Sequence, residues 1–236
     1  MLRVATYNRA VHPDGNGGRF RDLTIDQFAA RLASSDPVPG GGSASAVAAA
    51  LGASLVTMVA SLTTGRPKYV DHEPMLAWAL DIGPRLSERF LALADEDAEA
   101  YAGYAAALKL PRETESEIEA RRGAMRAAAR AASEAPLRCL EACVDLVAAA
   151  EALAGRSNPN AASDVDVAAL LGEAAARGAA ANVLINLPST GDPEYEEATT
   201  VRVTELQSAI EDLASRAHQA VASGEPRDPV EPVGRA

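Results

Sequence analysis

The chain has 236 residues, enough for one large domain or two small ones with a sizeable buried core. Aromatic residues make up only 4% and alanine is abundant, which disfavours a β-sandwich or barrel and favours helices. The 33 acidic and 22 basic side chains give a net charge of −11. Recognition of nucleic-acid phosphates needs a basic surface, so the charge excludes general nucleic-acid binding, and an anionic ligand would need a local cluster of cations.

The cysteines and the apolar stretches indicate the cellular compartment in which we expect the protein. Cys139 and Cys143 lie four apart in a helical pattern and match neither zinc-ligand spacing nor a disulfide framework. No metal is therefore predicted, and the N-terminus lacks the apolar run of a secretory signal. Residues 40–65 carry no charge and are long enough to span a bilayer, but Gly, Ala, Ser and Thr dominate them. We expect a tightly packed soluble helix there, and a cytoplasmic chain that does not enter a membrane.

Pro- and Gly-rich segments stand at both ends of the given sequence. Residues 1–21 are expected to form a flexible leader, and residues 222–236 a flexible tail. The helical domain between them covers residues 22–221. Hydrophobic periodicity predicts about seven helices, at residues 24–34, from the Gly40–Gly42 turn to 64, and at 74–108, 114–135, 136–154, 163–187 and 194–221. Long helices with short connections predict an all-α, antiparallel bundle.

Capping residues and prolines set the expected helix boundaries. Thr24 with Gln27, and Thr114 with Glu117, have the spacing of capping boxes, and Ser163 is placed to cap the sixth helix. Pro84 is expected to kink or divide the third helix. Pro136 is expected to begin the fifth helix.

A glycine run opens the uncharged second helix, in the order Pro39-Gly40-Gly41-Gly42-Ser43. Glycines let the backbone turn sharply, and a helix start offers free N–H groups to an anion. The alternative is a plain cap followed by a small-residue face for close helix packing. The run is not a P-loop, because no strand precedes it and no lysine follows at the required place.

Two cations stand at the far end of the same helix, in Gly65-Arg66-Pro67-Lys68-Tyr69. In an acidic protein, Arg66 and Lys68 could clamp a carboxylate or phosphate, with Tyr69 lining the pocket. Simple charge compensation at a helix C-terminus is the alternative.

Asp97 lies in the middle of an apolar stripe on the third predicted helix. The stripe recurs every three or four residues through Leu86, Phe90, Leu93, Tyr101, Tyr104 and Leu108. A carboxylate that faces a core is costly unless paired, and burial raises its pKa, which suits proton transfer near neutral pH. The alternative is a structural carboxylate paired with a basic or hydroxyl group on a neighbouring helix. Asp95, Glu96 and Glu99 point elsewhere and are expected to be solvated.

Other polar residues are weaker candidates. Asp164 belongs to the turn and helix start at residues 158–164, where an acid usually interacts only with the helix dipole. Asn182 and Asn186 are one helical turn apart and share a face, so they could bond a heterocycle or simply a neighbouring helix. The three histidines are isolated, and no spacing argues for a serine nucleophile.

These motifs together resemble the cyclodeaminase/cyclohydrolase family, which comprises the cyclodeaminase domain of formimidoyltransferase-cyclodeaminase and its stand-alone bacterial relatives. The resemblance covers about residues 22–215, in order and with fitting gaps. It rests on residues 37–43 and 65–69, on Asp95-Glu96-Asp97-Ala98-Glu99-Ala100-Tyr101 and Leu110-Pro111, and on residues 160–165 and 182–187. One departure is Pro67, which interrupts a run that is often more basic in the family.

The resemblance implies an all-helical, dimeric, folate-binding enzyme, and we expect no metal and no cofactor beyond its tetrahydrofolate substrate. Members close the ring of 5-formimidoyltetrahydrofolate with loss of ammonia, giving 5,10-methenyltetrahydrofolate, and this cyclodeaminase reaction is the first expectation. Some members are methenyltetrahydrofolate cyclohydrolases, which is the second. A non-catalytic folate-binding helical module is the third.

The resemblance also implies roles for the candidate residues. Asp97 matches the acid thought to transfer the proton. Arg66 and Lys68 would meet the glutamyl carboxylates of a folate, including those of a polyglutamylated one, and the glycine turn would offer backbone donors. The expected binding residues are Gly40, Gly41, Gly42, Ser43, Arg66, Lys68, Tyr69, Tyr101, Asp164, Asn182 and Asn186.

Overall fold

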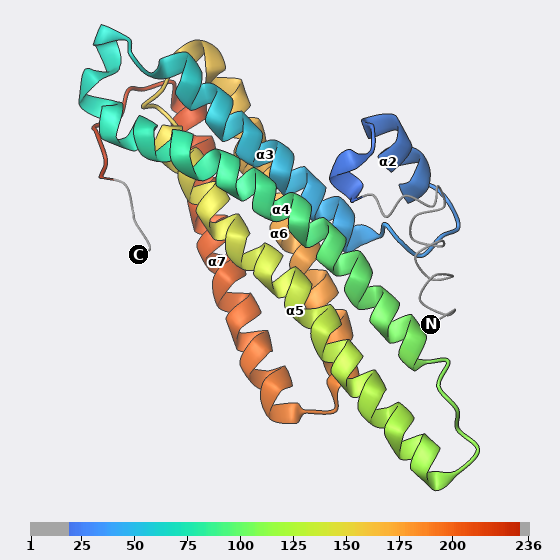
Figure 1. Cartoon of the computed structure of the whole chain (residues 1–236). Helices are drawn as coiled ribbons and strands as arrows, with labels where there is room; N and C mark the ends of the chain where they lie inside the picture. Colours follow the sequence, from blue (N-terminus) through green and yellow to red (C-terminus); the bar gives the residue numbers. More distant parts are fainter. Residues whose placement is uncertain (1–18, 232–236) are drawn as a thin grey trace.

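The computed structural model describes residues 19–231, and these form six α-helices and no strand. The helices are α2 (Ile25–Leu32), α3 (Gly41–Thr63), α4 (Glu73–Ala107), α5 (Glu115–Leu153), α6 (Ala162–Asn186) and α7 (Pro193–Ser223). Four short 3₁₀ turns lie between or before them: η1 (Phe20–Asp22), η2 (Pro67–His72), η3 (Pro159–Ala161) and η4 (Leu187–Thr190). Helices α3 to α7 pack as an antiparallel bundle, so the all-α prediction is confirmed (Figure 1).

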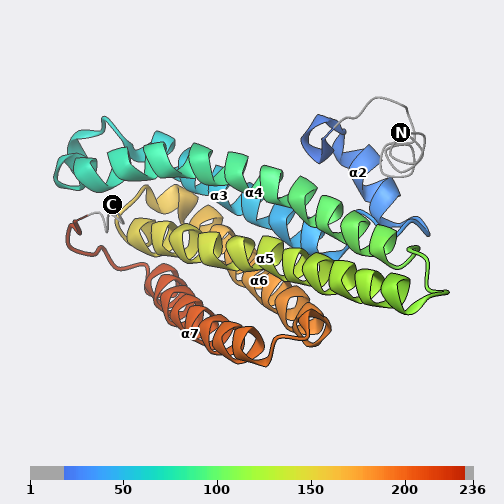
Figure 2. The ribbon, with the colours of Figure 1, turned by 60° about the horizontal axis from the view of Figure 1, so that its bottom comes forward.

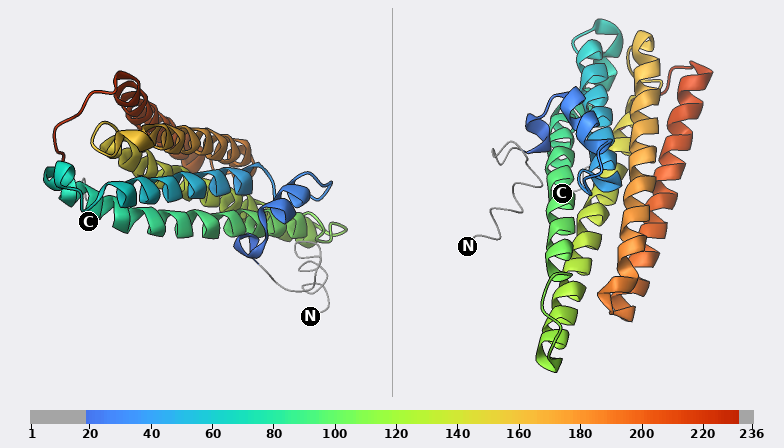
Figure 3. Two further views of the ribbon diagram at one scale, coloured as in Figure 1. Left: turned by 90° about the horizontal axis from the view of Figure 1, so that it is seen from above. Right: turned by 90° about the vertical axis from the view of Figure 1, so that its right-hand side faces the viewer.

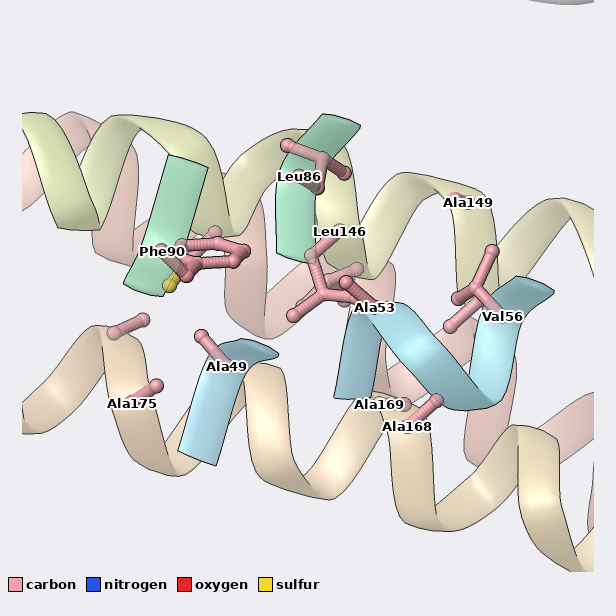
Figure 4. Packing of buried hydrophobic residues seen from close by; sticks show 14 of the residues in the cluster. Ala49, Ala53, Val56, Leu86, Phe90, Leu146, Ala149, Ala168, Ala169 and Ala175 are labelled. Carbon is pink, nitrogen blue, oxygen red and sulfur yellow. The ribbon is translucent and has the colours of Figure 1, made fainter. Parts of the chain in front are cut away.

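The uncharged helix α3 supplies small side chains to the core. Ala49, Ala53 and Val56 are buried and pack among larger side chains such as Phe90 of α4 and Leu146 of α5 (Figure 4). Because these side chains are short, the neighbouring backbones approach α3 closely. By length and composition, α3 and the span from Pro159 to Thr190 could each cross a membrane, but 50% and 44% of the apolar windows are buried inside the bundle. Core helices of a bundle have the same character.

Helices α4 and α5 run without interruption through their prolines. Helix α4 has 35 residues around Pro84, and α5 has 39 residues around Pro136. The prediction of separate helices on either side of Pro136 was therefore wrong. A proline removes the N–H that would bond the carbonyl four residues earlier, which here is that of Ala132. The side-chain amide of Asn186 on α6 donates to this carbonyl at 3.0 Å, so a tertiary hydrogen bond takes the place of the missing helical one.

The helix starts agree with the predictions in two places and differ in a third. Both capping boxes form, at Thr24 and at Thr114. The prediction that Ser163 caps α6 was wrong, because that helix begins at Ala162, directly after η3. The turn is instead capped by Asn158, whose side-chain oxygen accepts a hydrogen bond from the backbone N–H of Asn160 at 3.2 Å.

Helix α2 lies outside the bundle and buries none of its residues (Figures 2 and 3). It is tethered through η1, where Phe20 is buried and its backbone N–H donates to the Asp95 carboxylate at 2.7 Å. Of the expected leader the structure describes residues 19–21, where Phe20 is buried and Arg21 is half-buried, while residues 1–18 lie outside the described part. In the expected tail, the backbone N–H of Arg227 donates to the carbonyl of Gly155, and Arg156 donates to the carbonyl of Asp228.

We predict that Asn186 and Pro136 are energetically coupled. Asn186→Ala should lower the free energy of unfolding by about 1 kcal/mol, because the Ala132 carbonyl loses its partner. In a Pro136→Ala background the same change should cost much less, since the new backbone N–H at 136 bonds Ala132 itself. Urea unfolding of the double-mutant cycle measures this coupling. The control is Asn182→Ala, which removes a hydrogen bond within α6 and should change the free energy of unfolding equally in the wild-type and Pro136→Ala backgrounds. If Asn186→Ala also had the same effect in both backgrounds, the account would be contradicted.

Candidate active site around Asp97

The side chain of Asp97 crosses from α4 to the first turn of α3. Its Oδ2 lies 3.0 Å from the hydroxyl oxygen of Ser43, which is fully buried. The backbone N–H of Ser43 also donates to this carboxyl group. The hydroxyl of Ser43 lies 3.0 Å from the carbonyl oxygen of Ala94 as well, one turn before Asp97. The carboxyl group is thus held at a helix N-terminus, the end of a helix that favours negative charge.

Gly42 makes this approach possible. A Cβ atom at position 42 would overlap all three atoms of the Asp97 carboxyl group. The glycine run therefore permits close packing of α3 against α4. The acidic group that lies at this helix start is the chain's own Asp97 carboxyl group. The hydroxyl of Ser43 is fully buried in this chain and contacts the Asp97 carboxyl group.

The surroundings of Asp97 raise its pKa. Burial disfavours the ionised carboxylate and moves the pKa above its ordinary value of 3.8, while the hydrogen bonds from Ser43 oppose this shift. Ser43 has one hydroxyl hydrogen, which the ionised carboxylate accepts. When Asp97 is protonated, that hydrogen can turn to the Ala94 carbonyl and Asp97 can donate to the Ser43 oxygen. Asp97 therefore has a hydrogen-bond partner in both of its protonation states, which suits a group that gains and loses a proton.

Three further candidates lie at this end of the bundle. Asn182 on α6 faces the glycine turn, with its amide nitrogen 3.8 Å from where a Cβ of Gly41 would stand. The Asn182 amide donates to the carbonyl of Gly178 at 2.8 Å, and the Asn186 amide donates to the backbone carbonyls of Ala132 and Asn182. Tyr101 follows Asp97 by one turn of α4 and is 43% exposed. The Asp97 end, as we call it, comprises Gly40, Gly41, Gly42, Ser43, Asp97, Tyr101, Asn182 and Asn186.

The other candidates lie at the opposite end of α3. Arg66, Lys68 and Tyr69 belong to the connection that follows its C-terminus, and Asp164 stands in the first turn of α6. Helix α3 has 23 residues, so about 33 Å separate the two ends at 1.5 Å per residue. Within one chain the predicted residues therefore form two groups, and we call the second, comprising Arg66, Lys68, Tyr69 and Asp164, the Lys68 end.

Two acidic neighbours of Asp97 have partners on other segments. Glu96, whose side chain is 33% exposed, pairs with Arg89 at 2.9 Å and Arg138 at 2.6 Å, and the half-buried Asp95 accepts the hydrogen bond from η1. The partners come from segments distant in sequence, which a single-helix pattern does not show. Among residues 19–231, no group of three or more His, Cys, Asp and Glu side chains could hold a metal ion.

Sequence reasoning missed His72. It set the histidines aside as isolated, but the structure places His72 in the lining of a cavity with Lys68 and Asn158. The available signal was its position four residues after Lys68 in a short connection.

The chain is similar to known proteins both in sequence and in fold. Residues 24–205 match the model of the formiminotransferase-cyclodeaminase family. A methenyltetrahydrofolate cyclohydrolase from Methylorubrum extorquens is 36% identical over 200 residues, which cover 85% of this chain and 96% of that protein. A formimidoyltransferase-cyclodeaminase from Rattus norvegicus is 33% identical over 185 residues, 78% of this chain but only 34% of that longer protein.

A solved structure has the same fold. The formiminotetrahydrofolate cyclodeaminase of Thermotoga maritima superposes with a TM-score of 0.79 at 28% identity, and the match covers 86% of this chain and 98% of that one. The resemblance drawn from the ordered motifs is thereby confirmed: the chain belongs to the formiminotransferase-cyclodeaminase family.

Proposed function

We propose that this chain is a tetrahydrofolate enzyme in which Asp97 transfers a proton at the carbon that joins N5 and N10 of the folate. The observation that carries the proposal is a largely buried carboxyl group with a raised pKa, held against a helix start by Ser43. The relatives named for cyclodeaminase and cyclohydrolase activity support the folate class of substrate. The motif match to the family's acid supports Asp97 as the group involved.

The first candidate reaction is the cyclodeaminase one. N10 attacks the formimidoyl carbon of 5-formimidoyltetrahydrofolate, and a tetrahedral carbon forms. The bond from that carbon to the departing nitrogen then breaks, ammonia leaves, and 5,10-methenyltetrahydrofolate remains. The nitrogen must be protonated to leave, and a carboxylic acid with a raised pKa can supply the proton near neutral pH. The deaminase of Thermotoga maritima, matched over nearly its whole length, supports this candidate.

The second candidate is the cyclohydrolase reaction, which the higher identity to the Methylorubrum extorquens protein favours. Water adds to the methenyl carbon, and the bridge opens to a formyl derivative. The same carboxyl group, now ionised, would accept a proton from the attacking water. Both reactions pass through a tetrahedral carbon at the same position, so one site serves either.

A paired assay with purified protein tests the proposal. One arm supplies 5-formimidoyltetrahydrofolate and follows ammonia release and methenyl absorbance; the other supplies methenyltetrahydrofolate and follows its loss. Ammonia with methenyl formation identifies the cyclodeaminase, and methenyl loss alone identifies the cyclohydrolase. Tight folate binding with neither reaction would leave a non-catalytic folate-binding module and overturn the proposal.

We predict that Asp97→Asn lowers turnover by about 10²- to 10⁴-fold, because the amide cannot exchange a proton with the substrate. The control is Glu99→Gln, two residues along the same helix and exposed, which should retain wild-type turnover. Steady-state kinetics of the two variants, with circular dichroism to verify folding, provides the measurement. Turnover by Asp97→Asn at the level of the control would remove Asp97 from the mechanism.

We predict that Asp97 also lowers stability at neutral pH. Its pKa in the folded chain is raised, so the protonated form stabilises the fold at low pH, and that contribution is lost as pH rises through the raised pKa. The uncharged Asp97→Asn variant should therefore melt at a higher temperature than the wild type near pH 7. The difference should shrink as the pH falls toward about 4. Thermal unfolding across this range checks the sign; a constant or reversed difference would contradict the assignment.

We further propose that two copies associate and complete the site. Exposed apolar side chains remain on the packed helices α3 and α6, and they include Leu51, Met58, Leu62, Val167 and Leu170. Such surface on helices that otherwise form the core is typical of an interface. A two-fold axis across the middle of α3 would place the Asp97 end of one copy beside the Lys68 end of the other. Arg66 and Lys68 would then meet the glutamyl carboxylates of the folate bound at Asp97.

Mixing two inactive variants tests this arrangement. Asp97→Asn and the double variant Arg66→Ala/Lys68→Ala, unfolded and refolded together, should recover about a quarter of wild-type activity, since half of the dimers contain one intact site out of two. Refolding each variant alone is the control. No recovery in a mixture that sedimentation shows to be dimeric would place each active site within one chain.

A further inference from the structure

A cavity lies between the first part of α5 and the connection from α6 to α7. The N-terminal part of α5 extends past the end of α6, and η4 packs against its side (Figures 1 and 3). The cavity has a volume of about 410 Å³, within the roughly 300–1,000 Å³ of small-molecule sites. We call it the Arg126 cavity, and its lining residues are Ile118, Arg121, Arg122, Met125, Arg126, Pro188, Ser189 and Gly191.

Positive charge gathers in this lining. Three arginines and, among the described residues, no acidic side chain line the cavity. Arg122 pairs with the Glu119 carboxylate at 2.7 Å, while Arg121 donates to the neutral carbonyl of Leu108 at 3.2 Å. Within ion-pair distance, one carboxylate of the described part therefore offsets three positive charges, although the whole chain has a net charge of −11. A local excess of cations in an acidic protein is suited to binding a small anion.

Arg126 lies against backbone instead of against an acid. A Cβ atom at Gly191 would stand 2.7 Å from the Nε atom of Arg126 and 3.2 Å from its Cζ atom, so only a glycine leaves room for the guanidinium. The φ of Gly191 is +63°, in the left-handed region that also favours glycine. Within residues 19–231 the Arg126 guanidinium makes no hydrogen bond and no ion pair. Because the side chain is exposed, its N–H donors are accessible to a ligand.

The charge and the donor geometry favour a phosphate group. Each guanidinium presents parallel N–H donors that match two phosphate oxygens at once. Three arginines and Glu119 leave two positive charges uncompensated, and a phosphate monoester carries about −1.5 to −2 charge at pH 7, whereas a carboxylate carries only one negative charge. Arg122 and Arg126 are four residues apart on α5 and share one face of the helix. Ser189 adds a hydroxyl group to the lining.

We propose that the Arg126 cavity binds a phosphate group of a small ligand, with Arg126 and Arg122 as its charged partners. The cavity shares no residue with the Asp97 end or the Lys68 end, so it is separate from the site proposed for folate. The inference therefore does not depend on the proposed function. Because η4 directly follows α6, a phosphate bound between η4 and α5 would link the end of α6 to α5 and stabilise the fold.

Calorimetry with inorganic phosphate, pyrophosphate and glutarate tests the site in the full chain. The wild type should bind one or both phosphate probes and should bind glutarate, a dicarboxylate, more weakly. Arg126→Ala should weaken phosphate binding by about tenfold, the loss expected for a hydrogen bond to a charged group. Glu119→Gln should strengthen binding, because it frees Arg122 from its carboxylate partner. The matched control is Arg112→Ala, which removes an exposed arginine between α4 and α5, outside the lining, and should leave binding unchanged.

Thermal unfolding and turnover give two further readouts. The probe that binds should raise the melting temperature of the wild type and of Arg112→Ala, and should raise that of Arg126→Ala much less. Without added phosphate, Arg126→Ala should retain the wild-type rate in the folate assay, because Arg126 belongs to neither end of α3. Circular dichroism verifies that the variant folds, and Arg122→Ala replaces it should it fail to do so.

The outcomes separate this inference from the proposed function. Equal binding by Arg126→Ala and Arg112→Ala, or no binding of either phosphate probe by the wild type, would overturn the site. Glutarate binding as tight as phosphate binding would overturn the phosphate assignment. Loss of folate turnover in a folded Arg126→Ala variant would place this arginine in the substrate site and overturn the separation. A chain that is silent in the folate assay but binds phosphate through Arg126 would support the inference while the proposed function fails.

Discussion

The contact between Asp97 and the first turn of α3 constrains the whole end of the bundle. The carboxyl group occupies the space that any side chain at position 42 would fill, so the glycine and the acid depend on each other. Ser43, fully buried beside them, ties the acid to α3 by both its backbone and its hydroxyl. The same turn brings Gly41 against Asn182, so α3, α4 and α6 meet around one largely buried titratable group. The cost of that burial is a raised pKa, and the proposed chemistry uses it.

Contacts elsewhere in the bundle support the end where α3, α4 and α6 meet. Prolines inside α4 and α5 would normally interrupt a helix, but in α5 the freed carbonyl is bonded by Asn186, which therefore has a structural partner besides any ligand. At the other end of α3, Arg156 and Arg227 donate to carbonyls in the last turn of α5, and Arg156 also donates to the carbonyl of Asp228. The two ends are too far apart to act on one small substrate within a chain, and this separation is what makes a paired arrangement of two copies physically reasonable.

Local signals were sufficient for much of the fold. Hydrophobic period, capping boxes and the uncharged stretch located the helices, and the position of Asp97 within an apolar stripe identified its burial. The continuity of α5 could not be predicted, because it depends on an amide from α6, about fifty residues away. The hydrogen bond from Phe20 to Asp95 and the one from Arg227 to Gly155 are also tertiary contacts between distant segments. The sequence analysis treated the candidate residues as one set. Only the three-dimensional structure shows that they form two groups at opposite ends of α3.

The most direct test of the central claim is the titration of Asp97 itself. Carbon-13 NMR of aspartate-labelled protein, with the Asp97 signal assigned by its loss in Asp97→Asn, reports the protonation of this one carboxyl group. The account predicts a midpoint clearly above the ordinary value of 3.8, and a further rise in Ser43→Ala, where a hydrogen bond to the ionised form is missing. A midpoint at or below 3.8 would mean that Asp97 is a structural carboxylate, and the proposed proton transfer would lose its physical basis.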